Sequence, residues 1–386
     1  MGSVESRISD LCLFKEVNGV AETSGATITS ASTKQTDGTP QPTTNPNKNN
    51  NSTPPTPGVA KAGTLVSSEV ASLWSTYMND SMSLCLMAHF AASSLPQDFQ
   101  PILQKAQNFA NRHLEWIRQS FQNTDYPIPI GFPVSDINRL AQPVFLHPFP
   151  AYYLYSMARI GLVSYAGSLS SSYTQEVRDF FSICLQESSE LTNQLCNYLD
   201  QLGLLERAPY SQSSNHVYHV NDRTFLGSPF HRTRPLTVLE ITHLHMNLVR
   251  SAFTKALLLG FAQTANDPAV QKILTDGVHL FQKHFDTLHH KLSEDFLPSP
   301  GLLDDYVSPS DTFTFALPLI LFHTSELLAG AIGNYGLALG ASPRQDIAVM
   351  YGKLMISMGK YAKHCMKFVI DRGWMEEPPM VPKRLQ

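Results

Sequence analysis

Charged residues are scarce in this chain, and neither sign of charge dominates. Asp, Glu, Lys and Arg make up 16% of its 386 residues, and the formal net charge is −4. A surface with so little basic charge lacks the electrostatic attraction that nucleic acids and anionic membranes require. We therefore expect no nucleic acid as a main partner. We expect protein partners or a homo-oligomer to cover part of this sparsely charged surface.

Long apolar runs are also missing. The strongest ones, residues 256–261 and 316–322, are far shorter than the about 20 residues that a helix needs to cross a bilayer. The first 14 residues carry Glu5, Arg7 and Asp10 and have no long apolar stretch of the kind found in secretory signals. The sequence predicts a cytoplasmic protein without a transmembrane segment.

Cysteine is infrequent and its pattern is not that of a disulfide framework. The chain has five cysteines, an odd number, and no Cys-x-x-Cys pair. Cys184 and Cys196 would lie about 18 Å apart along one helix, which is too far for a disulfide. Buried free thiols in a reducing compartment are the expectation.

Several catalytic motifs are absent as well. The chain has no Gly-rich phosphate loop, no dinucleotide fingerprint and no Gly-x-Ser-x-Gly turn that would expose a nucleophilic serine. These absences argue against the motif-bearing classes of nucleotide-binding enzyme and serine hydrolase. They leave no catalytic residue to nominate, and an enzyme is the less favoured interpretation.

Residues 16–64 contain no Leu and no aromatic residue, and they are rich in Thr, Asn, Pro, Ser and Gly. Such a segment cannot bury enough apolar surface to offset the entropy lost on ordering. The sequence predicts a disordered leader over residues 1–64, in which residues 8–14 form a short apolar head.

The last three-quarters of the chain is an internal repeat. Adding 171 to a position in the first copy returns the same residue type in the second, as in Glu69 and Glu240 or His113 and His284. After a slip of one residue the offset becomes 170 and holds to the end of the chain in these pairs: Pro148 and Pro318, Tyr165 and Tyr335, Gly203 and Gly373, Glu206 and Glu376. One structural unit of about 150 residues is therefore used twice.

Apolar residues recur at helical spacing in each copy, which predicts an all-α fold. In the first copy the helices run from near 65 to a break at 94–97, about 99–122, about 151–169, and on to Gly203. In the second they cover about 237–265, 268–292, 312–339 and 343–372. A proline-rich middle segment forbids a regular helix and is long enough to run the length of a bundle. This is the connectivity of ferritin-like bundles, which we expect at 65–209 and 236–386, joined by a loop at 210–235.

Three groups of residues resemble those of a known family. They are Trp74 and Tyr77 with the Asp-Ser-Met that follows at 80–82, the loop Pro-Ile-Pro-Ile-Gly-Phe-Pro at 127–133 with Asp136, and the tail Gly-Trp-Met-Glu-Glu-Pro-Pro at 373–379. From about residue 65 onward the chain is similar to a domain-of-unknown-function family of endospore-forming bacteria. The resemblance implies tandem ferritin-like bundles and a spore setting, since some members are labelled "putative spore coat protein". It implies no catalytic residues.

A metal site is the alternative that the residues themselves suggest. Ferritin-like metal sites use inward Glu and Glu-x-x-His pairs, and the first copy offers only Glu69, His113 and Glu115. In the second copy carboxylate and imidazole groups stand three residues apart on one helix face, the spacing that chelation needs. The candidate ligands are Glu240, His243, Asp286 and His289, with a second group of His323, Glu326 and His364, for Fe, Mn or Zn.

Three functions follow from these patterns. We favour a non-catalytic structural or interaction protein associated with spores, which needs no cofactor. The alternative is a metal-binding ferritin-like enzyme or sensor with its site in the second bundle. A third interpretation is a carrier of a small apolar ligand, with methionines of the last helix lining its pocket: Met350, Met355, Met358 and Met366.

Overall fold

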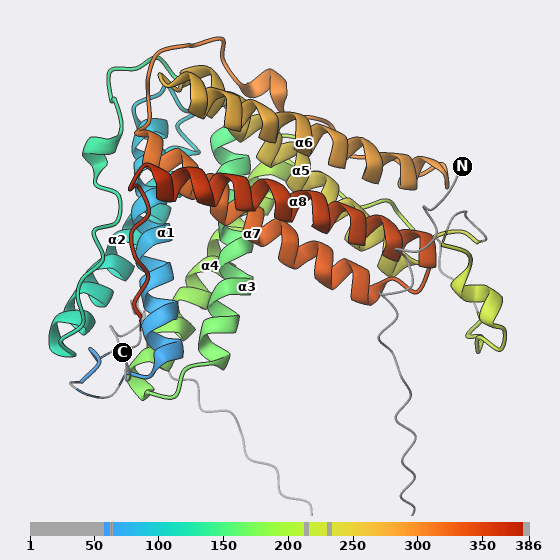
Figure 1. Cartoon of the computed structure of the whole chain (residues 1–386), viewed down its shortest axis with the longest axis horizontal. Helices are drawn as coiled ribbons and strands as arrows, with labels where there is room; N and C mark the ends of the chain where they lie inside the picture. The colour runs from blue at the N-terminus through green and yellow to red at the C-terminus, as the bar shows by residue number, and fades with distance from the viewer. Residues whose placement is uncertain (1–57, 62, 64, 212–215, 230–233, 381–386) are drawn as a thin grey trace, which may run out of the picture. The chain divides into compact units, whose positions relative to one another are not determined.

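The computed structural model describes residues 58–61, 63, 65–211, 216–229 and 234–380. Within those residues it contains eight α-helices and no strand (Figure 1), which confirms the all-α fold class. The leader predicted to be disordered falls almost wholly outside the described residues, as do its apolar head and Cys12. None of the helices described is long and apolar enough to cross a membrane.

Each repeat supplies four helices that pack in the same four pairs. The first repeat forms α1 (Ser67–Ala91), α2 (Gln100–Asn123), α3 (Phe149–Ser170) and α4 (Gln175–Gln201), and the second forms α5 (Val238–Thr264), α6 (Pro268–Ser293), α7 (Leu317–Ala341) and α8 (Gln345–Asp371). In each, successive helices form two hairpins, and the first and third helices and the second and fourth also touch. Two helical bundles result, and a likeness to ferritins in particular stays a prediction.

In both repeats the third residue of the first helix is a glutamate, Glu69 in α1 and Glu240 in α5. The carboxylate of Glu69 accepts hydrogen bonds from its own helix start at Val66 N (2.9 Å) and from Tyr173 N and Thr174 N (2.8 and 2.6 Å). Burial opposes the charge, but these backbone donors outweigh it and lower the pKa of Glu69. The carboxylate therefore caps one helix and fixes the α3–α4 turn against it, which explains why this residue recurs in the second repeat.

The connection between α2 and α3, here called strap 1 (residues 124–148), runs alongside α1. Phe132 N donates to Ser81 Oγ (3.1 Å), and further on Val144 N donates to His89 Nε2 (3.2 Å). Gly131 has φ +62°, and an added Cβ would lie 2.7 Å from Ser81 Oγ, so only glycine fits this close approach. Strap 1 is thus a proline-rich, extended segment that runs along the length of α1 (Figure 1).

Strap 1 and its equivalent in the second repeat, strap 2 (residues 294–316), pair with each other. Ile137 forms an antiparallel bridge with Phe315, and Phe145 forms one with Val307. Adding 170 to 137 and 145 gives 307 and 315, so each bridge is the image of the other. Such an exchange defines a two-fold relationship between the repeats. It also explains why α7 begins at Leu317 rather than at the predicted 312, because Thr314 O and Ala316 N are paired with strap 1.

The segments after α4 and α8, here called tail 1 (residues 202–211) and tail 2 (residues 372–380), are exchanged in the same way. Glu376 in tail 2 accepts from Ile130 N (2.9 Å) and Gly131 N (3.0 Å) of strap 1. Its equivalent Glu206 in tail 1 accepts from Gly301 N (3.3 Å) of strap 2. The tail and loop motifs that carry the family resemblance therefore contact each other across the repeats.

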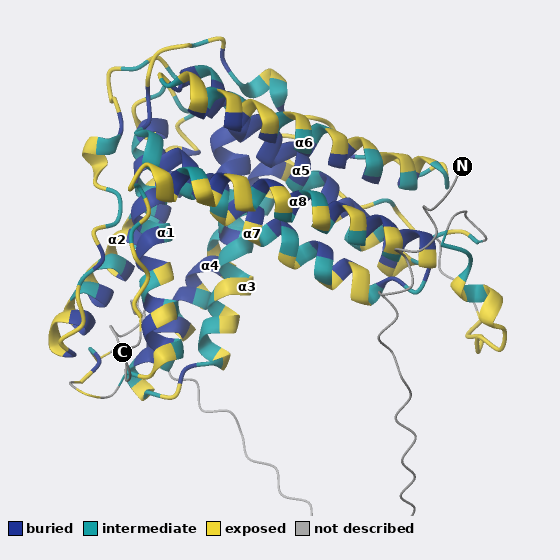
Figure 2. Cartoon of the chain, in the orientation of Figure 1, coloured by how far each residue is buried: buried dark blue, intermediate teal, exposed yellow. Residues whose placement is uncertain are grey.

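The two repeats share one apolar core, so neither bundle closes around an interior that is wholly its own. Phe145 and Phe149 of the first repeat stack with centroids 4.5 Å apart, and Phe149 stacks on Phe253 of the second. One cluster of buried side chains extends through both repeats, and a smaller one around Trp116 lies in the first alone. Buried residues accordingly line the facing sides of the helices (Figure 2). Residues 54–386 form one compact unit.

Candidate functional site

A buried cluster of ionisable side chains lies at the centre of the first bundle. The two ring nitrogens of His113 on α2 lie 2.9 Å from Asp80 Oδ2 on α1 and 2.8 Å from Glu187 Oε2 on α4. Glu187 is also paired with Arg112 through its other oxygen. All three side chains of the triad are less than 15% exposed. Two carboxylates and one imidazole from three helices are thus joined in one network.

The charges of this triad stabilise each other. Burial disfavours the imidazolium, but interactions with the Cys184 side chain and with the Asp80 carboxylate, which is also hydrogen-bonded to the ring, outweigh burial and hold the pKa of His113 well above its usual range. Burial likewise opposes the charge on Glu187, but His113 and Arg112 lower its pKa. His113 therefore carries a proton at neutral pH and donates to both carboxylates, which makes it a fixed cation and not a general base.

The second bundle has a neutral counterpart at the same positions. There His284 Nδ1 lies 3.1 Å from Tyr335 Oη and His284 Nε2 lies 2.8 Å from Ser357 Oγ. By the repeat offsets, Ser251 stands where the first bundle has Asp80, and Ser357 stands where it has Glu187. Burial, with a small contribution from Lys283, lowers the pKa of His284 to about 4. The second histidine is therefore uncharged at neutral pH.

A cavity of about 360 Å³ opens beside the charged triad, between α1, α3 and α7. Its polar lining includes Asp80, Asn79, Tyr165, Glu326 and His323, and its apolar lining comes from Met82, Met157, Ile160 and Leu327. Asn79 Nδ2 donates to Glu326 Oε2 (3.3 Å). We call this space the acidic cavity, because two carboxylates line it and no Lys or Arg does.

His323 is the unusual member of that lining. The residue is 1% exposed, and neither ring nitrogen has a hydrogen-bond partner among the residues that the structure describes. It is packed edge-on against Tyr153, with ring centroids 5.7 Å apart, and burial lowers its pKa to about 4. A neutral imidazole with one donor and one acceptor unused is costly to bury, and His323 is among the residues that line the acidic cavity.

The two-fold relationship places a second, much smaller cavity of about 50 Å³ at the equivalent position, between α3, α5 and α7. Its lining is basic instead of acidic, with Arg159 and Arg250. Arg250 replaces Asn79, and Ser156 replaces Glu326. The Arg250 guanidinium also lies close to Gly330, because a Cβ there would be 3.1 Å from its Nη1. The protein's own guanidinium thus fills space that is open in the first repeat.

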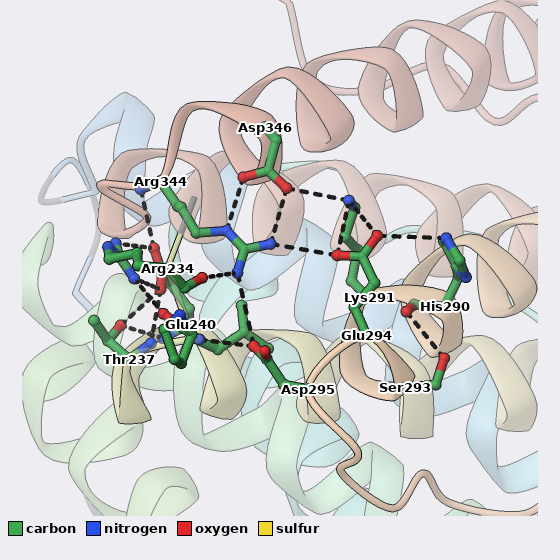
Figure 3. A network of polar contacts seen from close by, with 12 residues as sticks. Arg234, Thr237, Glu240, His290, Lys291, Ser293, Glu294, Asp295, Arg344 and Asp346 are labelled. Carbon is green, nitrogen blue, oxygen red and sulfur yellow. Dashed lines mark hydrogen bonds and ion pairs between the residues drawn. The ribbon is translucent and has the colours of Figure 1, made fainter. Parts of the chain in front are cut away.

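Glu240, the first candidate metal ligand, is fully occupied by protein groups (Figure 3). Its carboxylate is paired with both terminal nitrogens of Arg234 (2.9 and 3.0 Å) and accepts from Thr237 N and Arg344 N. Burial opposes its charge, but Arg234 and the backbone donors lower the pKa of Glu240. It has the same capping role as Glu69 in the first repeat.

The remaining candidates are dispersed or already bonded. His243 lines the small basic cavity, Asp286 accepts from Gln282 (2.8 Å), His289 Nδ1 lies 2.8 Å from Ser299 Oγ, and His364 is exposed. Among the described residues, no three His, Cys, Asp or Glu side chains are grouped so that they could hold a metal ion. The structure does bring His323 and Glu326 together, on the wall of the acidic cavity.

Sequence reasoning considered His113 but missed its partners Asp80 and Glu187, and it missed Arg250. The signal that could have found them was in the repeat itself. At these positions the two copies differ in charge: Asp against Ser, Glu against Ser, and Asn against Arg. Comparing the two copies position by position therefore shows where the charges inside the two bundles differ.

Comparison with known proteins supports the duplication. Residues 56–217 and 224–386 each match the model of one family, described as "Protein of unknown function (DUF3231)". A solved structure of a "putative spore coat protein" from Bacillus halodurans C-125 is 19% identical, with a TM-score of 0.35 over 39% of this chain and 98% of that chain. No curated protein is significantly similar to this chain.

Proposed function

Because this chain belongs to the DUF3231 family of proteins of unknown function, in two tandem copies, we propose that it is a non-catalytic structural and interaction protein. The observation that carries the proposal is the reciprocal exchange of straps and tails between the repeats. Glu376 holds strap 1 and Glu206 holds strap 2, so neither bundle can separate without losing contacts of the other. Two bundles that are held together in this way are better suited to assembly with other proteins than to catalytic turnover.

The buried ionisable groups support the same conclusion. Catalytic acids and bases need a free proton site near the reacting atoms, but His113 is held by two carboxylates and Glu240 by two arginines. The Cys184 thiol is buried, and burial raises its pKa, which makes it a poor nucleophile despite the neighbouring His113. These groups contribute to specifying and stabilising the fold.

The proposed setting is the spore, on the strength of the family resemblance. The test is to produce a tagged full chain in a sporulating host and to fractionate the purified spores. We expect the full chain in the fraction that is extracted with the spore coat. The Glu376→Ala variant loses the hydrogen bonds that hold strap 1, and we expect less of this variant in that fraction. A chain that stays with the mother-cell proteins would overturn the spore setting.

Metal binding remains the alternative, and elemental analysis decides it. Because Glu240 is already ion-paired and Asp286 and His289 have other partners, we expect Fe, Mn and Zn well below one ion per purified chain. Stoichiometric metal that is lost in His289→Ala would replace the structural proposal by a metal-dependent one.

A further inference from the structure

We propose that the acidic cavity, which α1 and α3 of the first repeat form together with α7 of the second, binds a small organic cation, a guanidine or primary amine that carries an apolar part. The inference goes beyond the structural role and does not depend on it. Three independent observations support it: the charge of the lining, an unpartnered buried histidine, and the guanidinium that fills the equivalent space in the second repeat.

The lining selects for positive charge. Asp80 and Glu326 contribute carboxylates from α1 and α7, and Asn79 adds a side-chain amide between them. Asp80 Oδ2 contacts His113, its Oδ1 accepts from Tyr165 Oη (3.5 Å), and both Asp80 and Tyr165 line the cavity. Three carboxylates (Asp80, Glu187 and Glu326) stand near two basic side chains (His113 and Arg112), so a ligand cation would balance the local charge. Charge-assisted hydrogen bonds to carboxylates are the strong ones.

His323 supplies the polar contact that the carboxylates do not. His323 is 99% buried and lines this cavity, and its two ring nitrogens have no hydrogen-bond partner within the described part of the chain. A bound N–H group would donate to the unprotonated nitrogen and so remove the cost of burying it unpaired. The first repeat has no equivalent histidine, since Tyr153 stands at that position.

The second repeat shows which group fits. In the equivalent cavity Arg250 places its guanidinium beside Gly330, and the space that remains is about 50 Å³. There serines replace both carboxylates, as Ser251 for Asp80 and Ser156 for Glu326. The small basic cavity therefore contains a guanidinium of the protein and, among the described residues, no acidic side chain lines it. The acidic cavity is lined by carboxylates and, within the same described residues, by no Lys or Arg. The missing cation is what an external ligand would provide.

Size and apolar lining define the rest of the ligand. A volume of about 360 Å³ exceeds what one guanidinium needs and lies within the range of small-molecule sites. Met82, Met157 and Leu327 supply apolar contact away from the carboxylates. We therefore use benzamidine as the probe, a planar cation on an apolar ring, and benzamide as its neutral isostere.

The experiment measures binding to the full chain by calorimetry and by the ring signals of His323, assigned with His323→Phe. We expect benzamidine to bind and to shift those signals, and benzamide to bind at least tenfold more weakly. Glu326→Gln should weaken benzamidine about tenfold, which corresponds to the loss of one charge-assisted contact. Glu190→Gln, an exposed carboxylate on α4, is the matched control and should leave binding unchanged.

A second variant keeps the test informative if a lining substitution perturbs the fold. Asn79→Arg transfers the arrangement at Arg250 into the first repeat, so the new guanidinium should occupy the cavity and abolish benzamidine binding without loss of helicity. Equal binding of benzamide, no binding of benzamidine at millimolar concentration, or binding that leaves the His323 signals unmoved would each overturn the proposal.

Discussion

His113 and His284 occupy the same position in the two repeats, 171 residues apart, yet the first is charged and the second neutral. The difference lies in their partners. His113 lies between Asp80 and Glu187, whereas His284 lies between Tyr335 and Ser357. The pKa of the first is raised and that of the second lowered to about 4. A duplicated fold has thus kept the buried imidazole and changed the charge around it.

These opposite shifts give opposite dependences of stability on pH. The raised pKa of His113 contributes stability that is present below the unfolded value of about 6.5 and is lost as the pH rises through the folded value. A lowered pKa contributes stability that is present above about 6.5 and is lost as the pH falls toward 4. His89, His284 and His323 all belong to the second kind, with pKa values of about 4.

The first prediction is therefore acid destabilisation well above the carboxylate range. Between pH 7 and pH 5 each of these three histidines should reduce the free energy of unfolding by about 2 kcal/mol. Urea denaturation at several pH values measures it, and His284→Asn should reduce the slope by the contribution of that one ring. A stability that is flat from pH 7 to pH 5 would show that these rings are not buried as neutral groups.

The second prediction concerns the charged triad. Asp80→Ser alone or Glu187→Ser alone should destabilise the fold by about 3–5 kcal/mol, because each leaves the buried ion network unbalanced. The double variant reproduces Ser251 and Ser357 of the second repeat, so His113 can lose its proton as His284 has done. We expect its cost to be clearly less than the sum, with the pKa of His113 falling below 6.5 in an NMR titration. Additive costs would mean that the three groups act independently.

Much of the fold could be predicted from the sequence, because periodicity and duplication are local and repetitive signals. The helices and the proline-rich straps follow from the periodicity and the offset. The offset also places Glu69 and Glu240 at equivalent positions, but their capping role emerges only from the structure. The pairing of Ile137 with Phe315 could not be predicted in this way, since it depends on which face one repeat presents to the other. The acidic cavity could not be predicted for the same reason, because its lining combines Asp80 of one repeat with His323 of the other.

The candidate metal ligands show a related limit of sequence patterns. The spacing of Glu240 and His243 places two side chains on one helix face, but it does not say what stands opposite. Glu240 meets Arg234 and the backbone of Arg344, which lies more than 100 residues away in sequence. A pattern within one helix cannot reveal such a partner.

The third prediction tests the exchanged tails. Glu376→Ala removes the acceptor for two backbone donors, so the amides of Ile130 and Gly131 should exchange with solvent at least tenfold faster. Glu206→Ala removes a single, longer bond to Gly301 and should have a smaller effect on strap 2. Glu377→Ala, next to Glu376 but exposed, is the control. If amide hydrogen exchange in strap 1 is unchanged after Glu376→Ala, the contact between tail 2 and strap 1 does not hold the repeats together as the structural proposal requires.

The last prediction separates two helical glycines that look alike in sequence. A Cβ on Gly260 of α5 would lie 2.5 Å from the ring of Phe145 and 3.0 Å from Val144, whereas one on Gly333 of α7 would meet nothing within 4 Å. Gly260→Ala should therefore destabilise the fold by about 1–3 kcal/mol, because it pushes strap 1 out of the shared core. Gly333→Ala should stabilise it by about 0.5–1 kcal/mol through helix propensity alone. Thermal and urea unfolding of the two variants measure both signs. If Gly260→Ala is as stable as the parent, strap 1 does not pack against α5 as closely as the two-fold exchange requires.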